Sequence, residues 1–268
     1  MKIHQTAIIE EGASIGEGTE IGPYCFIKKD VVIGKNNKLT SHIVIEGNTT
    51  IGDNNKIYQF ASIGSDPQDL KFRGEPSKLE IGNGNIIREY VTIQPGTEGG
   101  GMLTKIGNNN AFMVHTHIAH DVIMGDRNIM VNGASLAGHI TVGNNVIMGA
   151  HTGYHQFIRL GDNTIISGGS MVVKDIPPYC NAQGDRAGLA GINKLGLERA
   201  GFTSDEIRNI RNVYKEVFLV PGILKEKLEK LEKDFAENEK VKRFITFLKE
   251  SQRGVTFPRK SDSQSEED

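Results

Sequence analysis

The chain has 268 residues, and its 31 basic and 33 acidic side chains give a formal net charge of −2. This near-neutral balance argues against a nucleic-acid-binding protein, and no apolar run approaches the ~18 residues that a membrane-spanning helix needs. With 32 Gly, no Trp and only 6% aromatic residues, the composition suits a narrow structure with tight corners.

An aliphatic or other large apolar residue recurs at every sixth position through most of the chain. The series runs from Ile3 to Ile63, resumes in phase from Ile81 to Ile93, and continues one position out of phase from Ile106 to Val172. A period of six is not helical and is three times the alternation of a strand. It is typical of a hexapeptide β-solenoid. The sequence therefore predicts a parallel column over residues 1–180, of about nine coils and roughly 40–45 Å tall.

Other features of this segment concern its corners and its surroundings. Asn pairs at 36–37, 54–55 and 144–145 suit corners with positive φ. Cys25 and Cys180 lie far apart in the predicted column, so we expect free thiols in a reducing cytoplasm. Because the repeat already begins at Ile3, we expect no signal peptide and a cytoplasmic protein.

The period changes near residue 181, and we expect an α-helical domain over residues 181–257. Residues 203–206 (TSDE) read as a capping box that opens a helix. Two more amphipathic stretches follow, near 223–236 and 239–252, and together these helices would cover an open end of the solenoid. We expect the polar tail, 258–268, to be disordered.

Two interruptions of the repeat, residues 64–80 and 94–105, are predicted to be loops that leave the column and return. Long loops on a regular scaffold usually carry function. Asp69 and Lys71 in the first loop offer an acceptor and a donor suited to a polar ligand.

Six of the eight histidines fall between residues 115 and 155. With 18 residues to a coil, His120 lies one coil, about 4.8 Å, from Gly138. Gln156 is one coil further, and His139 stacks over Asp121. An imidazole base beside an unhindered backbone N–H is the equipment of acyl transfer.

Two other interpretations of the histidines stay open at this point. His115, His117 and His120 could be read as zinc ligands. Strand alternation opposes this within one chain, but a site shared between subunits, as in gamma-class carbonic anhydrases, is possible. A non-catalytic scaffold would need no histidine edge at all.

Several short motifs occur in order within this framework. They are PQDLK at 67–71, GGG at 99–101, HIAHD at 117–121, LAGH at 136–139, HQF at 155–157, DIPPY at 175–179 and RAGF at 199–202. With the hexapeptide column and the helical cap, they closely resemble the bacterial acyl-[acyl-carrier-protein]–UDP-N-acetylglucosamine O-acyltransferases, from residue 1 to about 257. Members of this family carry out the first step of lipid A biosynthesis.

The resemblance implies a left-handed parallel β-helix, a homotrimer and active sites between neighbouring columns. It implies that His120 is the general base, that Asp121 orients it, and that the Gly138 N–H stabilises the oxyanion. The co-substrate would be the phosphopantetheine thioester of an acyl carrier protein, with no metal and no other cofactor. The acceptor would be a UDP-N-acetylglucosamine-type sugar nucleotide.

The resemblance also assigns substrate-binding residues. Those expected at the sugar and the acyl chain are Asp69, Lys71, Gln94, His117 and His139, and those expected at the nucleotide or phosphopantetheine are His155, Gln156 and Arg199. Gly168 is expected at the hydrocarbon ruler, where a missing side chain would leave room for a long acyl chain.

Two positions depart from the family's pattern. Gln94 stands where His is frequent, which leaves open whether the acceptor carries a 3-hydroxyl or a 3-amino group. Ala200 replaces a second basic residue, so one nucleotide contact is expected to be missing.

The nearest rival is the sister UDP-3-O-acylglucosamine N-acyltransferase, which shares the column. That enzyme begins with a separate domain, whereas here the repeat starts at Ile3. A gamma-class carbonic anhydrase lacks both the PQDLK loop and the long helical cap.

Overall fold

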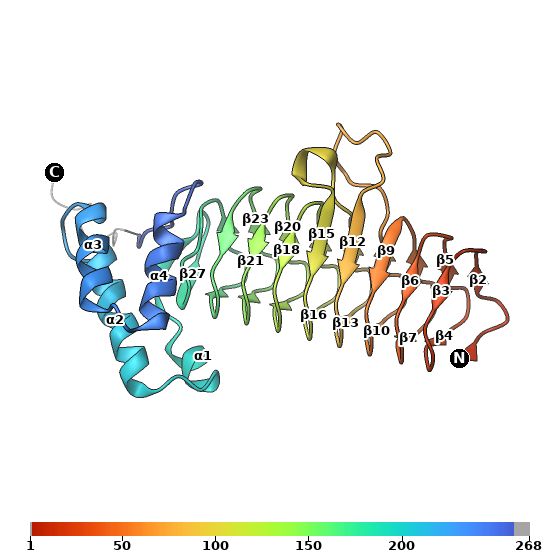
Figure 1. Ribbon diagram of the computed structural model, residues 1–268, viewed down its shortest axis with the longest axis horizontal. Coiled ribbons are helices and arrows are strands. Elements are labelled where there is room, and N and C mark those ends of the chain that lie inside the picture. The colour runs from red at the N-terminus through yellow and green to blue at the C-terminus, as the bar shows by residue number, and fades with distance from the viewer. Residues whose placement is uncertain (1, 260–268) are drawn as a thin grey trace.

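The protein is a column of short strands capped by helices. The computed structural model describes residues 2–259, so the expectation of a disordered tail over 258–268 falls almost entirely outside it. Figure 1 shows the coils side by side along the long axis, two loops projecting from one edge, and the helices gathered at the C-terminal end. The predicted fold class, a parallel β-helix followed by a helical region, is confirmed.

Three sheets form the sides of the column, and within the coils every pairing is parallel. Sheet A has β1 (Lys2–Ile3), β4 (Glu20–Ile21), β7 (Lys38–Leu39), β10 (Lys56–Ile57), β13 (Ile86–Ile87), β16 (Ala111–Phe112), β19 (Ile129–Met130), β22 (Ile147–Met148), β25 (Ile165–Ile166), β27 (Cys180–Gln183) and β28 (Gly188–Ile192). Sheet B has β2 (Ile8–Ile9), β5 (Phe26–Ile27), β8 (Val44–Ile45), β11 (Ser62–Ile63), β14 (Thr92–Ile93), β17 (His117–Ile118), β20 (Ser135–Leu136), β23 (Gly153–Tyr154) and β26 (Met171–Val172). Sheet C has β3 (Ser14–Ile15), β6 (Val32–Ile33), β9 (Asn48–Ile51), β12 (Lys78–Ile81), β15 (Leu103–Ile106), β18 (Ile123–Met124), β21 (Thr141–Val142) and β24 (Arg159–Leu160).

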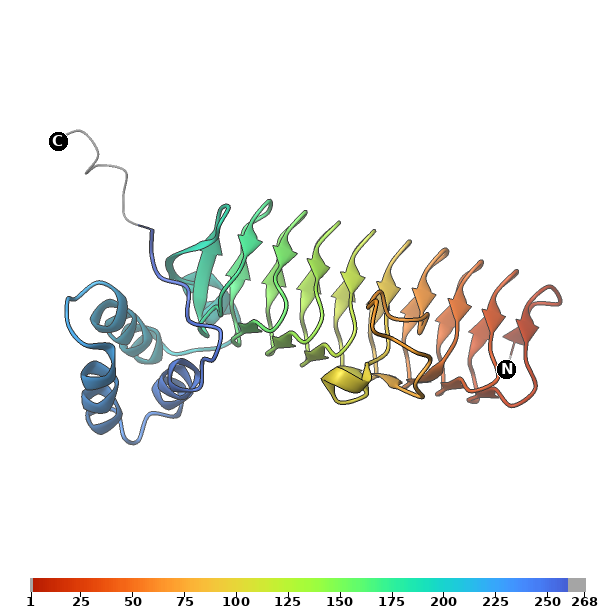
Figure 2. The ribbon, with the colours of Figure 1, turned by 90° about the horizontal axis from the view of Figure 1, so that it is seen from above.

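The six-residue series forms the core of the column. All its members from Ile21 to Val172 are buried, whereas Ile3, Ile9 and Ile15 at the N-terminal end are partly or largely exposed. Ile118, Leu136 and Tyr154 pair in successive strands of sheet B, as the coil spacing predicts. Figure 2 shows the coils following one another at even spacing down the column. Burial of this apolar series is the main force that stabilises the column.

One edge of the column, where sheet C passes to sheet A, is lined by hydrogen-bonded asparagines, and we call it the asparagine edge. Asn36, Asn54 and Asn145 have positive φ there, which confirms the corner prediction. Their buried neighbours form a ladder in which each side-chain oxygen accepts the backbone N–H of the next rung. The rungs are Asn37, Asn55, Asn85, Asn110 and Asn128.

A second edge, where sheet A passes to sheet B, carries a row of stacked rings, and we call it the aromatic edge. Its ring centroids are 4.8–5.3 Å apart from one coil to the next. The rings belong to Tyr24, His42, Phe60, Tyr90 and His115. All five residues have positive φ, and the three Tyr and Phe side chains are exposed.

The C-terminal end is closed by a hairpin and four helices. The hairpin of β27 and β28 is antiparallel and extends sheet A to Ile192. This hairpin was not predicted from the sequence, because antiparallel pairing has no six-residue period to reveal it. The helices are α1 (Lys194–Arg199), α2 (Ser204–Phe218), α3 (Leu224–Asp234) and α4 (Glu239–Lys249).

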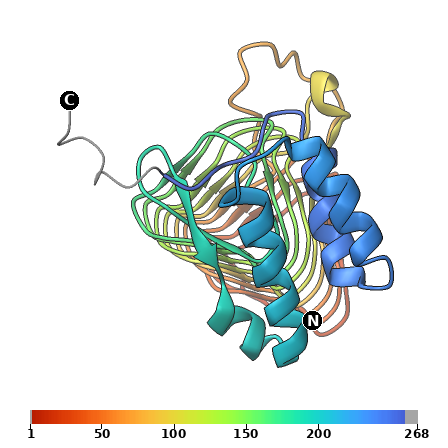
Figure 3. The ribbon, with the colours of Figure 1, turned by 90° about the vertical axis from the view of Figure 1, so that its left-hand side faces the viewer.

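The helices follow from their sequences. Thr203 and Glu206 form the predicted capping box at the start of α2. The buried face of α2, with Ile210 and Val213, and that of α4, with Phe244 and Leu248, meet in the core. Figure 3, seen from the helical end, shows the helices against the end of the column and the two loops projecting to one side. Among the described residues, no helix has the length and apolarity to cross a membrane.

Candidate active site

The third edge of the column, where sheet B passes to sheet C, carries both loops, and we call it the loop edge. It also carries the hydrogen-bonded residues His120 and Asp121, which we call the histidine pair. The first loop spans 64–77, between β11 and β12, and the second spans 94–102, between β14 and β15. Both are slightly shorter than predicted, because residues 78–81 and 103–106 are strands. The corner of the next coil, 119–122, holds His120 and Asp121. Stacked coils therefore bring the two loops and this pair together along one edge.

Hydrogen bonds tie the two loops to each other. Gln94 Nε2 donates to the carbonyl oxygen of Asp66 at 3.3 Å, and the Glu98 N–H donates to Glu75 Oε1 at 3.1 Å. In the first loop, Asp69 Oδ1 accepts the backbone N–H of Lys71 at 2.9 Å, so these two residues lie close together. The Lys71 side chain stays exposed.

The centre of the site is a hydrogen-bonded imidazole and carboxylate. His120 Nδ1 lies 2.8 Å from Asp121 Oδ2, and the Asp121 side chain is only 1% exposed. A carboxylate only accepts hydrogen bonds, so the proton of this bond sits on Nδ1 of the histidine. Nε2 of a neutral His120 is then unprotonated and available as a base.

Gly138 provides the space into which this imidazole fits. A Cβ at Gly138 would lie 2.5 Å from His120 Cε1 and 2.8 Å from Nε2, which no real side chain tolerates. The neighbouring N–H, of His139, donates to the His120 carbonyl at 3.1 Å. The predicted stacking of His120 against Gly138 is therefore present.

His139 and His117 flank the central pair. The ring of Phe157 stacks on that of His139 with centroids 4.4 Å apart. Burial lowers the pKa of His139, while the charges of Asp121 and Asp69 oppose this. Burial, followed by the nearby His120, also lowers the pKa of His117, whose Nδ1 lies 2.7 Å from Thr92 Oγ1. Both imidazoles are therefore held toward their neutral form.

Other predicted residues lie further along the same edge. His155 and Gln156 are exposed on the corner after β23, two coils beyond His120. A guanidinium nitrogen of Arg253 lies 2.9 Å from His155 Nδ1, so the C-terminal segment reaches this part of the edge.

Two predicted residues are not brought to His120 within one chain. Gly168 is exposed on the aromatic edge, between β25 and β26. Arg199 is exposed at the end of α1, and Figures 1 and 3 show α1 on the side of the molecule away from the loops. Within one chain, these two residues and the histidine pair therefore lie on different sides of the structure.

The sequence reasoning missed three residues around Asp121. Thr97 contacts both carboxylate oxygens, and Thr104 Oγ1 accepts the Asp121 N–H at 2.8 Å. A Cβ at Gly100 would lie 1.9 Å from the carboxylate carbon. The GGG motif was the available signal, but nothing in it pointed to Asp121.

The ligand atoms of His120, Asp121 and His139 lie within 4.8 Å of one another, a spacing that a metal ion would accept. The carboxylate oxygens, however, already accept hydrogen bonds from Thr97 and His120. His120 and Asp121 therefore belong to a hydrogen-bonded network, whereas His139 Nδ1 lies 3.7 Å from Asp121 Oδ2 without a hydrogen bond. His115, one of the three residues of the zinc interpretation, stacks on Tyr90 at the aromatic edge, so that trio does not assemble within one chain.

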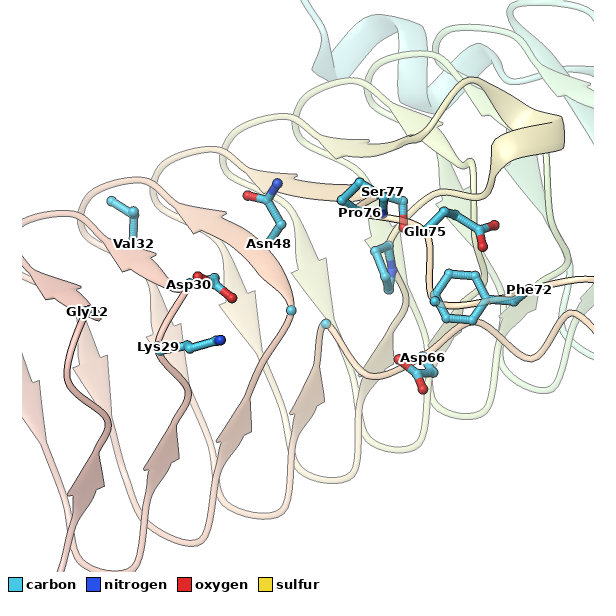
Figure 4. Close-up of a pocket in the computed structure, with 14 residues that line it drawn as sticks. Gly12, Lys29, Asp30, Val32, Asn48, Asp66, Phe72, Glu75, Pro76 and Ser77 are labelled. Carbon is cyan, nitrogen blue, oxygen red and sulfur yellow. The ribbon is translucent and has the colours of Figure 1, made fainter.

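A groove of about 640 Å³ lies on the N-terminal side of the first loop. Figure 4 shows loop residues such as Phe72 and Glu75 on one side of it, and Lys29 and Asp30 from earlier coils on the other. None of the predicted site residues lines this groove. It is therefore separate from the histidine pair on the same edge.

Known proteins share both the fold and the length of this chain. A family model described as "Udp N-acetylglucosamine O-acyltransferase; Domain 2" matches residues 175–256. The acyl-[acyl-carrier-protein]–UDP-N-acetylglucosamine O-acyltransferase of Aliarcobacter butzleri is 48% identical, over 96% of this chain and 99% of that protein. The crystal structure of the UDP-N-acetylglucosamine O-acyltransferase of Moraxella catarrhalis is 43% identical with a TM-score of 0.93, covering 96% of this chain and 100% of that one. The UDP-N-acetylglucosamine acyltransferase of Campylobacter jejuni is 38% identical with a TM-score of 0.92, covering 96% and 100%.

The fold, shared with a solved acyltransferase at a TM-score of 0.93, and the names of the curated relatives make this chain a hexapeptide-repeat acyltransferase. Identity over nearly the full length then settles the family. The chain belongs to the acyl-[acyl-carrier-protein]–UDP-N-acetylglucosamine O-acyltransferases. The sister N-acyltransferase and the carbonic anhydrase are not favoured.

Proposed function

We propose that this enzyme transfers a 3-hydroxyacyl chain from acyl carrier protein to the 3-position of a UDP-N-acetylglucosamine-type sugar, the first step of lipid A biosynthesis. The observation that carries the proposal is the His120 imidazole, bonded to Asp121 on one side and lying against Gly138 on the other. The names of near-full-length relatives support the same donor and acceptor.

In the proposed mechanism, Nε2 of His120 takes the proton from the acceptor group at the sugar 3-position. The acceptor atom attacks the thioester carbonyl, and the resulting oxyanion is stabilised by the Gly138 N–H. The C–S bond then breaks, and the imidazolium returns the proton to the leaving thiolate. Asp121 holds the imidazole in the required tautomer and stabilises its charged form.

We assign the acceptor sugar to side chains of the loop edge near His120. Asp69 and Lys71 on the first loop, with His117 and His139 on the column, offer both donors and acceptors to its hydroxyl groups. Gln94 is buried at the root of the second loop, and its Oε1 makes no hydrogen bond to a described residue. An amide oxygen can accept a hydrogen bond from either a 3-hydroxyl or a 3-amino group, so competition between the two acceptors is the measurement that separates them.

We further propose that the working unit is a homotrimer in which each site uses two chains. The support is that Gly168 and Arg199 lie on different sides of the chain from His120. In a closed cyclic assembly, the side of one column that bears them faces the loop edge of its neighbour. Arg199 would then contact the nucleotide beside His155 and Gln156, with no second basic residue at Ala200, and Gly168 would leave the acyl groove open to a long chain.

The scheme draws on no metal and no cofactor other than the phosphopantetheine of the donor, because side chains and one backbone N–H supply every group it needs. A cytoplasmic location is part of the proposal, in keeping with a donor carried by acyl carrier protein.

The proposal is tested by incubating the purified enzyme with 3-hydroxyacyl carrier proteins and both sugar nucleotides, and identifying the products by mass spectrometry. His120→Asn keeps an N–H for Asp121 but removes the base, so we expect a loss of about 10²–10⁴-fold in kcat. The matched control is His4→Asn, at an exposed position of the first coil, several coils away from His120 and from Gly168. It should leave kcat near the wild-type value.

Two results would reject the proposal. One is the absence of any acylated sugar nucleotide with the wild-type enzyme. The other is a His120→Asn variant that retains more than about a tenth of wild-type activity.

A further inference from the structure

The carboxylate of Asp121 is held from the second loop as well as from the histidine. The Thr97 N–H donates to Oδ1 at 2.8 Å, and the Thr97 hydroxyl lies 2.6 Å from Oδ2. Thr97 is itself only 3% exposed. Because a carboxylate accepts and cannot donate, the hydroxyl proton points at Asp121. We propose that Thr97 is a positioning residue for the acyl transfer, acting through Asp121 on His120. This inference rests on the proposed function and adds to it.

The Thr97 side chain does not cap the turn that follows it, as a threonine at this position usually does. Thr97 precedes the short 3₁₀ turn η1 (Glu98–Gly100) in extended conformation, where a threonine hydroxyl ordinarily accepts a backbone N–H of the turn. Here the side chain makes no such capping bond. The turn is closed instead by the Thr97 carbonyl, which accepts the Gly100 and Met102 N–H groups at 3.1 and 2.9 Å. The hydroxyl is therefore left for Asp121.

The turn also covers the carboxylate. Atoms of the Asp121 carboxylate lie within 2.3 Å of the place where a Cβ of Gly100 would be, so only glycine lets the loop come so close. Water is thereby kept from the carboxylate, whose side chain is 1% exposed, whereas His120 keeps 13% exposure for its substrate. Hydrogen bonds to a buried charge are stronger than those in water.

The consequence falls on His120. Oδ2 accepts hydrogen bonds from both the Thr97 hydroxyl and His120 Nδ1. The hydroxyl therefore fixes the orientation of the carboxylate toward Nδ1–H. It also takes up part of the negative charge that would otherwise act on the imidazole alone. Removing the hydroxyl leaves a carboxylate that turns more freely and attracts the imidazolium more strongly. Both effects act on His120 through Asp121, without any contact between Thr97 and the substrate.

The test compares Thr97→Val with Thr97→Ser in steady-state assays from about pH 5 to 9. Valine keeps the shape and the backbone N–H but lacks the hydroxyl, so we expect kcat to fall about 10- to 100-fold. The KM for the sugar nucleotide should stay within about twofold. The rising limb of kcat/KM should move to higher pH, because the imidazolium is more strongly favoured. Serine restores the hydroxyl and should restore both kcat and the limb.

The matched control is Thr116→Val. Thr116 is buried to the same degree, and its hydroxyl has no hydrogen-bond partner among the described residues. It should leave kcat and the pH profile unchanged. If Thr97→Val does not fold, Thr97→Ala makes the same comparison with a smaller side chain.

The inference is overturned if Thr97→Val matches Thr116→Val in kcat and pH profile. It is also overturned if lost activity follows lost folded protein and serine does not restore it. A readout that needs no turnover separates this inference from the proposed function. The ring ¹⁵N resonances of His120, assigned with His120→Asn, should show the Nδ1–H tautomer and a changed titration in Thr97→Val. An enzyme without acyl transfer would reject the proposed function and leave this measurement valid.

Discussion

At the scale of single residues, the site depends on the positions of a few protons. The bond from His120 Nδ1 to a buried carboxylate leaves Nε2 free, and burial keeps the flanking His117 and His139 toward their neutral forms. Of the three imidazoles, His120 is the one hydrogen-bonded to the carboxylate, whereas at His139 burial outweighs the charge of Asp121 and at His117 burial lowers the pKa. An edge built from one residue type can in this way carry different roles.

The lowered pKa of His117 makes a prediction about acid stability. Its folded-state pKa lies below the ordinary 6.5, so the unfolded chain binds more protons in acid and the free energy of unfolding falls as the pH drops below that value. His117→Gln removes this contribution. Between about pH 7.5 and 5.5, its melting temperature should therefore fall less than that of the wild type. An equal fall in melting temperature for the two proteins would contradict the lowered pKa of His117.

The pairing of His120 with Gly138 could be predicted from the sequence because both lie in uninterrupted coils, where spacing alone gives the contact. Thr97 could not, because it reaches Asp121 from a loop whose path has no period. Its hydrogen bonds join residues 24 apart, a separation that matches neither one coil nor two. The contact between His155 and Arg253 could not be predicted for a related reason, because one partner lies in the column and the other follows the helices near the C-terminal end.

At the scale of elements, both loops could have been assigned to the edge that bears His120. Each break in the repeat follows an isoleucine of sheet B, Ile63 and then Ile93, and Ile118 pairs next in the same sheet. Whatever follows these three strands must leave the column at the same edge. The β27–β28 hairpin was beyond such reasoning, because it pairs antiparallel and carries a register shift.

The asparagine ladder makes a prediction at this scale. Asn85 is fully buried, accepts from Asn110, and donates to Asn55. Asn85→Ala leaves buried partners unpaired on both sides, so we expect a loss of about 2 kcal/mol or more in the free energy of unfolding. Chemical denaturation with circular dichroism measures it.

The matched variant is Asn83→Ala, two residues away on the same edge. Asn83 makes similar bonds to Asp53 and Asn108, but its side chain is exposed, so water replaces them. We expect a clearly smaller loss. Equal losses in the two variants would show that burial of the ladder is not what matters.

At the scale of the whole molecule, the separation of His120 from Arg199 predicts complementation between chains. His120→Asn and Arg199→Ala subunits should each be poorly active alone. When they are unfolded together in equal amounts and refolded, about a quarter of the sites receive an intact histidine from one chain and an intact arginine from its neighbour. Activity should recover accordingly.

The comparison that checks this is the same mixture without unfolding, which should stay inactive as long as subunits do not exchange. Activity that never recovers after refolding, in assemblies shown by sedimentation to contain both chains, would place the two residues in one chain's site.

The two corner loops have a consequence for how such a column can change. The coil from Ile63 to Ile93 holds 30 residues and the coil from Ile93 to Ile118 holds 25, yet the strands before and after both pair in register. A single residue added within a strand would instead turn every following side chain to the opposite face. Insertions are therefore absorbed at the corners, and here they are absorbed at the edge that holds the histidine pair. The corners therefore let the chain gain residues without disturbing its core. At the loop edge, such insertions change the surroundings of the histidine pair, while the stacked coils keep the spacing of the pair itself.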